Sequence, residues 1–269
     1  MRLGTSSYTF DWAVGSGPHR RADGLTALGL IDRAKRMGVR VLQIADNMPE
    51  GTYTEASVEA IAAHARQEGI AVELGTRGSS VEHLRRFVGL ARRLGSPILR
   101  TVTDKGSDEP SVAEIIDRFA SLADDCREAG VVIAMENHDR LKCAELAHIA
   151  ATLPRHFGIC LDTVNSLGTL EGPDVVVETL GPYTVNLHLK DFVVVRYPSM
   201  FGFRVEGRPA GQGMLDIPWL LAKLKSFGRD CNAILELWPL QKDTPEESIR
   251  LEDEWAEASV LALRRWIPD

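Results

Sequence analysis

The sequence lacks the features that mark several large classes of protein. No stretch approaches the roughly 18 apolar residues that a membrane-spanning helix needs. The first predicted strand begins at Arg2, which leaves no room for a signal peptide. The net charge is −7 and there is no block rich in Lys and Arg, so a basic surface for nucleic acid is missing. We therefore expect a cytoplasmic protein that binds neither membranes nor nucleic acids.

Two further motifs are missing. The four cysteines (Cys126, Cys143, Cys160 and Cys231) have no CxxC spacing, which argues for buried, reduced thiols over disulfides or a cysteine zinc site. The glycine-rich GxGxxG turn of a dinucleotide-binding fold is also absent after the first predicted strand, where the chain reads GTSSYTF.

What the chain does contain is a regular alternation of apolar runs and amphipathic segments. The segments between the runs have apolar residues at helical spacing. Capping signals such as Ser79-x-x-Glu82 and Ser111-x-x-Glu114 predict where helices begin, and glycines such as Gly95 predict where they end. The predicted strands lie near residues 2–7, 39–45, 70–75, 97–102, 131–136, 157–162, 184–189 and 232–237.

This alternation predicts either a closed parallel barrel or a doubly wound sheet. Polar residues lie in or after most strands, among them Gln43, Glu73, Arg77 and Arg100, and do not gather at one switch point. A barrel lined from many strands explains that spread. We predict an α/β fold, a (β/α)8 TIM barrel that forms a single domain over residues 1–269.

Four side chains end separate apolar runs: Glu136 in VVIAMEN, Asp162 in GICLD, His188 in TVNLH and Glu236 in NAILE. The C-terminal edge of the strands is the active-site face of such a barrel, so the four should converge. Alone, each could be a salt-bridge partner or a structural residue. Together, three carboxylates and an imidazole suit one divalent cation. We expect Mn²⁺ or Mg²⁺, with Co²⁺ or Zn²⁺ as alternatives.

The strings AMENHDR, GICLDTVNS, NLHLKDF, GQGMLD and ILELW resemble the xylose isomerase-like TIM-barrel superfamily of the sugar phosphate isomerase/epimerase type. This group includes ketose 3-epimerases, hydroxypyruvate isomerase and inosose dehydratase. The resemblance implies that Glu136, Asp162, His188 and Glu236 bind one metal, and that both glutamates also act as the catalytic acid/base pair. Asn165 stands where many members carry His, which argues against the multi-zinc chemistry of the related endonuclease IV.

Several residues are candidates for binding substrate. Lys190 follows His188 by two positions, so strand alternation directs it into the same mouth. There it would hold a substrate carboxylate or polarise an oxygen, unless it only forms a salt bridge with a neighbouring Glu. The other candidates are Asn165, Gln43, Tyr8 and His138. An aromatic residue such as Tyr8 could equally serve packing.

A long segment interrupts the alternation. Residues 192–215 show no helical periodicity and are rich in glycine, aromatics and arginine, including Arg204. Long loops usually have a function. We predict a loop that closes over the active site and in which Arg204 binds an anionic substrate; a surface excursion or a subunit contact are the alternatives.

These observations support three functions. The leading one is a sugar or sugar-acid isomerase/epimerase that works through a metal-stabilised enediolate. The second is a lyase of the same superfamily, either a dehydratase or a decarboxylase of a 3-oxo sugar acid, because loss of CO₂ generates the same enediolate. The third is a non-catalytic sugar-binding protein, which would need no acid/base pair. The expected partner is a small sugar or sugar acid, and the sequence leaves open whether the chain forms a homo-oligomer.

Overall fold

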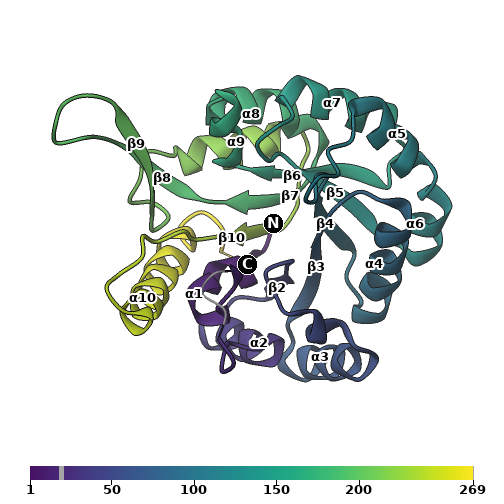
Figure 1. Ribbon diagram of the computed structural model, residues 1–269, viewed down its shortest axis with the longest axis horizontal. Coiled ribbons are helices and arrows are strands. Elements are labelled where there is room, and N and C mark those ends of the chain that lie inside the picture. Colours follow the sequence, from purple (N-terminus) through teal and green to yellow (C-terminus); the bar gives the residue numbers. More distant parts are fainter. Residues whose placement is uncertain (18–20, 269) are drawn as a thin grey trace.

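The strands form one closed parallel barrel. The computed structural model describes residues 1–17 and 21–268, and its barrel strands follow the order β1-β10-β7-β6-β5-β4-β3-β2 with helices outside (Figure 1). The barrel strands are β1 (Leu3–Ser6), β2 (Val41–Ile44), β3 (Ala71–Arg77), β4 (Ile98–Val102), β5 (Val132–Glu136), β6 (Phe157–Asp162), β7 (Thr184–Leu189) and β10 (Ala233–Leu235). The predicted TIM barrel is confirmed, and only β3 extends beyond its predicted range.

Helices connect the strands and cover the barrel. They are α1 (Asp11–Val14), α2 (Ala27–Arg36), α3 (Glu55–Glu68), α4 (Val81–Leu94), α5 (Val112–Ala120), α6 (Ala123–Ala129), α7 (Cys143–Thr152), α8 (Pro173–Leu180), α9 (Ile217–Ser226) and α10 (Pro245–Leu263). Short 3₁₀ helices are η1 (Ser7–Phe10), η3 (Glu50–Tyr53), η4 (Asn165–Thr169) and η5 (Gly181–Tyr183). Among these described helices, none combines the length and apolar character needed to cross a bilayer.

The predicted helix ends are largely correct. Ser111 forms a capping box with Glu114 at the start of α5, and Gly95 ends α4 at φ 70°. The prediction at Ser79 is wrong: the N-cap of α4 is Ser80, and the Ser79 hydroxyl instead donates to the Thr103 carbonyl. A tertiary acceptor from the β4–α5 loop therefore replaces the local cap.

Strand alternation makes the barrel interior polar. Residues such as Leu42 and Leu74 belong to the apolar core that the helices share. Their neighbours Gln43, Glu73 and Arg100 are buried polar residues on the alternate positions, which face inward. This pattern places a polar layer beneath the C-terminal strand ends.

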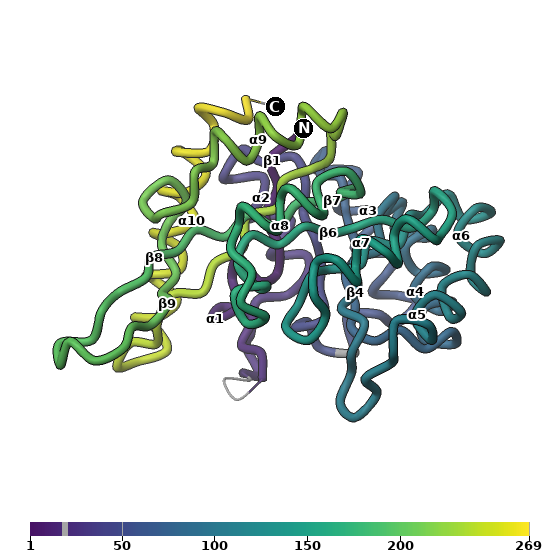
Figure 2. Tube along the Cα trace, turned by 90° about the horizontal axis from the view of Figure 1, so that it is seen from above, coloured from purple at the N-terminus to yellow at the C-terminus, as the bar shows by residue number. Residues whose placement is uncertain are grey.

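The segment predicted as a long loop is a β-hairpin. Strand β8 (Asp191–Arg196) pairs antiparallel with β9 (Phe203–Arg208), with Val194 opposite Val205. Both views show the hairpin extending away from the barrel beside α10 (Figures 1 and 2). The prediction of irregular backbone was wrong because alternating side chains over two short stretches form strands without helical periodicity.

The GQGMLD string that follows the hairpin folds around one carboxylate. Asp191 Oδ2 accepts hydrogen bonds from the amides of Gly211 at 2.8 Å and Gly213 at 2.9 Å, and Oδ1 accepts one from Leu215 at 3.1 Å. A Cβ at Gly213 would collide with Asp191 Oδ1, so the close approach requires glycine. Asp191 thus has a structural role at the base of the hairpin.

A second buried carboxylate joins the last helix to the first. Glu252 on α10 accepts hydrogen bonds from the amides of Trp12 at 2.8 Å and Ala13 at 3.1 Å. Burial raises the pKa of Glu252 from 4.5 to about 8 despite these two bonds, and the charge of Asp11 adds to the increase. The folded state therefore favours the neutral carboxyl group over most of this range.

This shift makes stability depend on pH. Between the unfolded and folded pKa values the folded chain binds more protons at Glu252, so the stability that this residue contributes is fully present below pH 4.5 and is lost as the pH rises towards 8. We expect the free energy of unfolding to fall by roughly 3 kcal/mol more in the wild type than in Glu252→Gln between pH 5 and pH 8. Urea unfolding of both proteins over this range measures the difference. Identical pH profiles would show that Glu252 does not carry this proton.

Candidate metal centre and active site

The four predicted ligand residues meet at the C-terminal end of the barrel. Glu136 and Asp162 end β5 and β6, His188 lies near the end of β7, and Glu236 directly follows β10. From His188 Nδ1, Glu136 Oε2 lies at 3.2 Å, Glu236 Oε1 at 3.4 Å and Asp162 Oδ2 at 3.9 Å. None of the four is more than 2% exposed. Four separate strand ends therefore converge on one buried point.

Lys190 compensates two of the carboxylates. Its Nζ lies 2.8 Å from Asp162 Oδ2 and 3.0 Å from Glu236 Oε2. Burial alone would lower the pKa of Lys190, but Asp162 and Glu236 outweigh it and raise that pKa above its ordinary value. Burial opposes ionisation of Glu236 as well, yet His188 and Lys190 hold its pKa below the usual range. Lys190 thus forms salt bridges with Asp162 and Glu236, which was one of the two roles expected for it.

Arg100 on β4 compensates the third carboxylate. Its Nε pairs with Glu136 Oε2, and its Nη1 lies 2.6 Å from Asp46 Oδ1. Glu136 Oε1 accepts a hydrogen bond from Asn165 Nδ2 at 2.7 Å. Burial would raise the pKa of Glu136, but Arg100 and then His188 hold it well below its usual range. Arg100 and Asn165 therefore hold the two oxygens of Glu136 in place.

Two ligand atoms lack normal hydrogen bonds. Asp162 Oδ2 and His188 Nδ1 are buried, and neither has a hydrogen-bond partner among the described residues; Asp162 Oδ2 has only the ion pair with Lys190, and His188 Nδ1 faces Glu136 Oε2 at 3.2 Å. Such atoms are costly to leave unpaired. Their convergence, together with the oxygen-rich donor set, fits a hard to borderline divalent cation. Glu136, Asp162, His188 and Glu236 would hold it.

A chain of amides orients the imidazole. His188 Nε2 lies 2.7 Å from Gln43 Oε1, and Gln43 Nε2 lies 3.2 Å from Glu73 Oε2. Glu73 also accepts from Asn186 Nδ2 at 2.8 Å and from Asn232 Nδ2 at 2.7 Å. Because Glu73 draws the amide N–H groups towards itself, the Gln43 oxygen faces His188. That arrangement assigns a proton to Nε2, so Nδ1 is the nitrogen that can bind a cation.

The structure therefore places Gln43 behind His188. It is fully buried, and its side chain contacts the imidazole, Glu73 and Asn186. Position 43 pairs in register with Ser6 and Glu73. Its contact with substrate remains a prediction.

A cavity of about 280 Å³ opens beside the four residues. Its lining includes Tyr8, Trp12, Lys190, Glu236 and Trp238. Polar groups at the base and aromatic rings at the wall suit a small polyol. A larger cavity of about 420 Å³ between the N-terminal loops and α3 contains none of the four ligand residues.

The other predicted substrate residues differ in position. Asn165 contacts Glu136 and lies 3.5 Å from Lys190 Nζ, so it belongs to the site. His138 Nδ1 lies 2.7 Å from Asp139 Oδ2, and its Nε2 is 3.4 Å from Arg77 Nη2, on the rim.

Arg204 lies in the hairpin, where its Nε pairs with Glu206 and its guanidinium lies 5.6 Å from the centre of the Tyr197 ring. Among the described residues, the lining of the 280 Å³ cavity includes none from the hairpin. Closure of the hairpin over substrate remains a prediction.

Comparisons with known proteins assign the family. The model of the xylose isomerase-like TIM barrel matches residues 31–259. The chain belongs to this family. It is 31% identical to the 3-oxo-isoapionate decarboxylase of Pectobacterium atrosepticum over 264 residues, which cover 98% of this chain and 95% of that protein.

Solved structures show the same fold at low identity. A D-psicose 3-epimerase solved in the presence of D-fructose has a TM-score of 0.72 at 16% identity, with 99% of both chains covered. A xylose isomerase-like TIM barrel protein from Mycobacterium smegmatis, solved in complex with magnesium, has a TM-score of 0.70 at 13% identity, with 97% of both chains covered. The chain is thus a sugar-enzyme barrel of this family with a buried candidate metal site.

Sequence reasoning did not assign Arg100, Ser6 or Glu73 to the site. Arg100 pairs with Glu136, and Ser6 Oγ donates to Glu236 Oε1 at 3.1 Å. An arginine inside a predicted strand is a signal in itself, because a buried guanidinium needs a carboxylate partner. Glu73, a carboxylate inside a predicted strand, carries the same kind of signal, whereas Ser6 does not.

The amide chain predicts a specific pattern of metal affinity. Gln43→Met leaves His188 Nε2–H without its acceptor, so the dissociation constant for Mn²⁺ should rise about 10- to 100-fold. Glu73→Met should cause a similar loss through Gln43, and the double variant should lose no more than Gln43→Met. Glu73→Gln keeps an acceptor and should bind Mn²⁺ within about threefold of the wild type. Isothermal titration measures all four.

Thr101→Val is the matched control for these variants. It removes another buried polar group of the barrel, one that bonds only the carbonyls of Gly78 and Val102, and it should leave Mn²⁺ affinity unchanged. Wild-type affinity in a folded Glu73→Met protein, or additive losses in the double variant, would disprove the coupling.

Proposed function

We propose that this chain is a divalent-metal-dependent decarboxylase of a 3-oxo sugar acid. The relative named 3-oxo-isoapionate decarboxylase aligns with 98% of the chain at 31% identity, and it supports this activity over isomerisation. The buried carboxylates and imidazole supply a metal site of the kind that the reaction uses. The fit between this site and the reaction rests on the contacts of Glu136 and Lys190.

The substrate would lie in the cavity beside Lys190 and Glu236. Its carbonyl and neighbouring hydroxyl oxygens would face the point where the four ligand residues meet, and its carbon chain would lie against Tyr8, Trp12 and Trp238. When bound, the cation supplies a Lewis acid for the negative charge that develops on the carbonyl oxygen. The carbonyl end of the substrate would thereby lie beside the buried ligand residues.

The reaction needs one bond to break and one proton to arrive. The bond between the carboxylate carbon and its neighbour breaks, CO₂ leaves, and the electron pair passes to the carbonyl group as an enediolate. The Lys190 ammonium, which faces the cavity and lies 3.0 Å from Glu236 Oε2, can stabilise this charge and supply the proton directly or through Glu236. The product is a ketose with one carbon fewer.

The environment of Glu136 favours this reaction over epimerisation. An epimerase needs a base on each side of the substrate, and a good base needs a pKa near the working pH. Arg100 and Asn165 occupy both oxygens of Glu136, and Arg100 holds its pKa well below its usual range. Decarboxylation needs no base to begin, so it is compatible with a Glu136 that only binds the cation.

An isomerase or epimerase is the second candidate. Glu136 and Glu236 both lie within 3.4 Å of His188 Nδ1, so two carboxylates reach the same reacting point. In that case both would move protons, as the family resemblance implies.

We expect the Mn²⁺-loaded protein to convert a 3-oxo sugar acid in D₂O to a ketose one carbon shorter. One deuterium should appear, in a single configuration, at the carbon that lost the carboxylate, because a group of the protein delivers it. NMR of a panel of 3-oxo acids and ketoses measures carbon count and deuterium position together.

Spontaneous decarboxylation is the control, since it places deuterium without stereochemical preference. EDTA should reduce the reaction to that background, and added Mn²⁺ should restore it. Deuterium exchange into a ketose with no loss of carbon would instead identify an isomerase, and no reaction above background with any member of the panel would contradict both candidates.

A further inference from the structure

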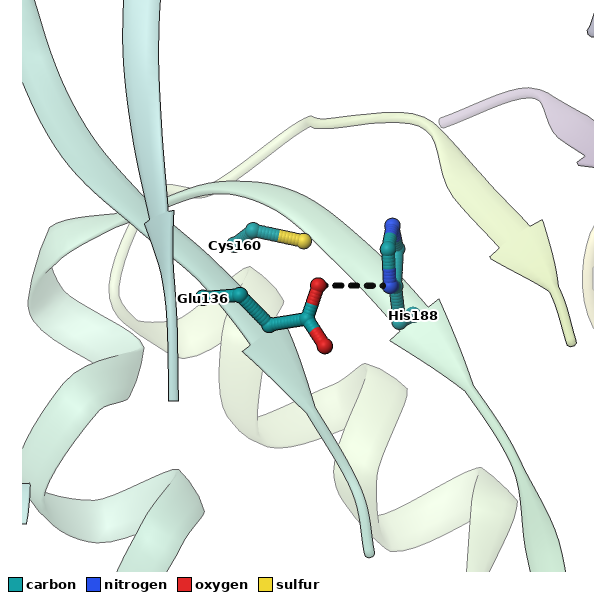
Figure 3. A group of neighbouring side chains, drawn as sticks. All are labelled: Glu136, Cys160 and His188. Carbon is teal, nitrogen blue, oxygen red and sulfur yellow. Dashed lines mark ion pairs between the residues drawn. The ribbon is translucent and has the colours of Figure 1, made fainter. Parts of the chain in front are cut away.

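A thiol lies directly beneath the candidate metal centre. Cys160 is on β6 two residues before Asp162, so both side chains face the barrel interior. Cys160 Sγ, a Glu136 oxygen and a His188 nitrogen all lie within 4.8 Å of one another, and all three residues are buried. Figure 3 shows the sulfur pointing towards the space between the carboxylate and the imidazole.

We propose that Glu136, Cys160 and His188 form a second metal site, at the floor of the barrel, for a soft divalent cation such as Zn²⁺ or Cd²⁺. It shares His188 with the group that Asp162 and Glu236 form, and it also uses Glu136, which lies 3.2 Å from the same imidazole. The two sites therefore exclude each other, and the choice between them depends on the softness of the ion.

The spacing suits such an ion. Zinc bonds of about 2.3 Å to sulfur and about 2.0–2.2 Å to nitrogen and oxygen place tetrahedral donors roughly 3.4–3.6 Å apart. His188 Nδ1 and Glu136 Oε2 are already 3.2 Å apart, and the sulfur lies within 4.8 Å of an oxygen of Glu136 and a nitrogen of His188. A side-chain shift on the order of 1 Å completes the three-donor set.

The donor chemistry separates the two sites. Carboxylates and water suit Mg²⁺ and Mn²⁺, whereas a thiolate selects softer ions. In the absence of a soft ion, Cys160 Sγ donates to Asn186 Oδ1 at 3.4 Å. Hard ions leave this hydrogen bond intact.

Binding of a soft ion changes one bond at sulfur. The S–H bond breaks, the proton passes to solvent, and the sulfur lone pair forms the bond to the cation. The cation then lies deeper than the point shared with Asp162 and Glu236, away from the cavity that contains Lys190. Soft ions should thus inhibit the enzyme; this consequence alone rests on the proposed function.

Titration of the full-length protein with Cd²⁺ tests the site by absorption spectroscopy. The wild type should develop a thiolate-to-metal charge-transfer band that saturates at one equivalent. Cys160→Ser should lack the band and bind Cd²⁺ about 100-fold more weakly or worse, while its Mn²⁺ affinity should stay within about threefold of the wild type. Cys143→Ser, which alters another buried thiol whose nearest polar partner is Ser166 Oγ, should keep the band.

A second measurement needs no variant. X-ray absorption of the zinc-loaded wild type should count one sulfur ligand at about 2.3 Å. A zinc site without sulfur, or a cadmium band that survives in Cys160→Ser, would overturn the proposal. Neither readout depends on turnover. A failed decarboxylase assay with Mn²⁺ would therefore refute the proposed function without affecting the proposal of this second metal site.

Discussion

The repulsion among three buried carboxylates is the constraint on which the rest of this structure depends. Asp162 and Glu236 bring oxygens within 4.8 Å of each other and of His188, where water cannot screen them. Two like charges at about 4 Å repel by on the order of 4 kcal/mol at an effective dielectric constant of about 20. Lys190 and Arg100 offset part of this charge, and a divalent cation would add to that compensation.

Hydrogen bonds in the polar layer below the site fix the orientation of the His188 imidazole. Glu73 orients Gln43, and Gln43 orients His188, so the imidazole presents one nitrogen to the carboxylates. Asn186 lies at the junction: it contacts Glu73, Gln43 and the thiol of Cys160. The barrel interior thus orients the candidate ligands.

Much of the fold and the convergence of the four candidate ligands could be predicted from the sequence, because both depend on local patterns. Apolar runs that end in Glu136, Asp162 and His188 became strands, and parallel strands in a barrel place their ends together. The partners that each side chain contacts in the folded barrel are harder to predict. Gln43 was expected to bind substrate, and the structure adds its contacts with His188 and Glu73; Arg204 was expected over the site, and the structure adds its ion pair with Glu206. Such partners come from distant segments, which no local pattern reveals.

Anomalous diffraction from crystals grown with Mn²⁺ is the most direct measurement of the central claim. The account predicts one strong peak within about 2.0–2.6 Å of a donor atom from each of Glu136, Asp162, His188 and Glu236. The Lys190 ammonium should then share or leave the oxygens of Asp162 and Glu236 that it contacts in this structure. No peak at that point, with Lys190 and Arg100 still pairing the carboxylates at saturating Mn²⁺, would contradict the account.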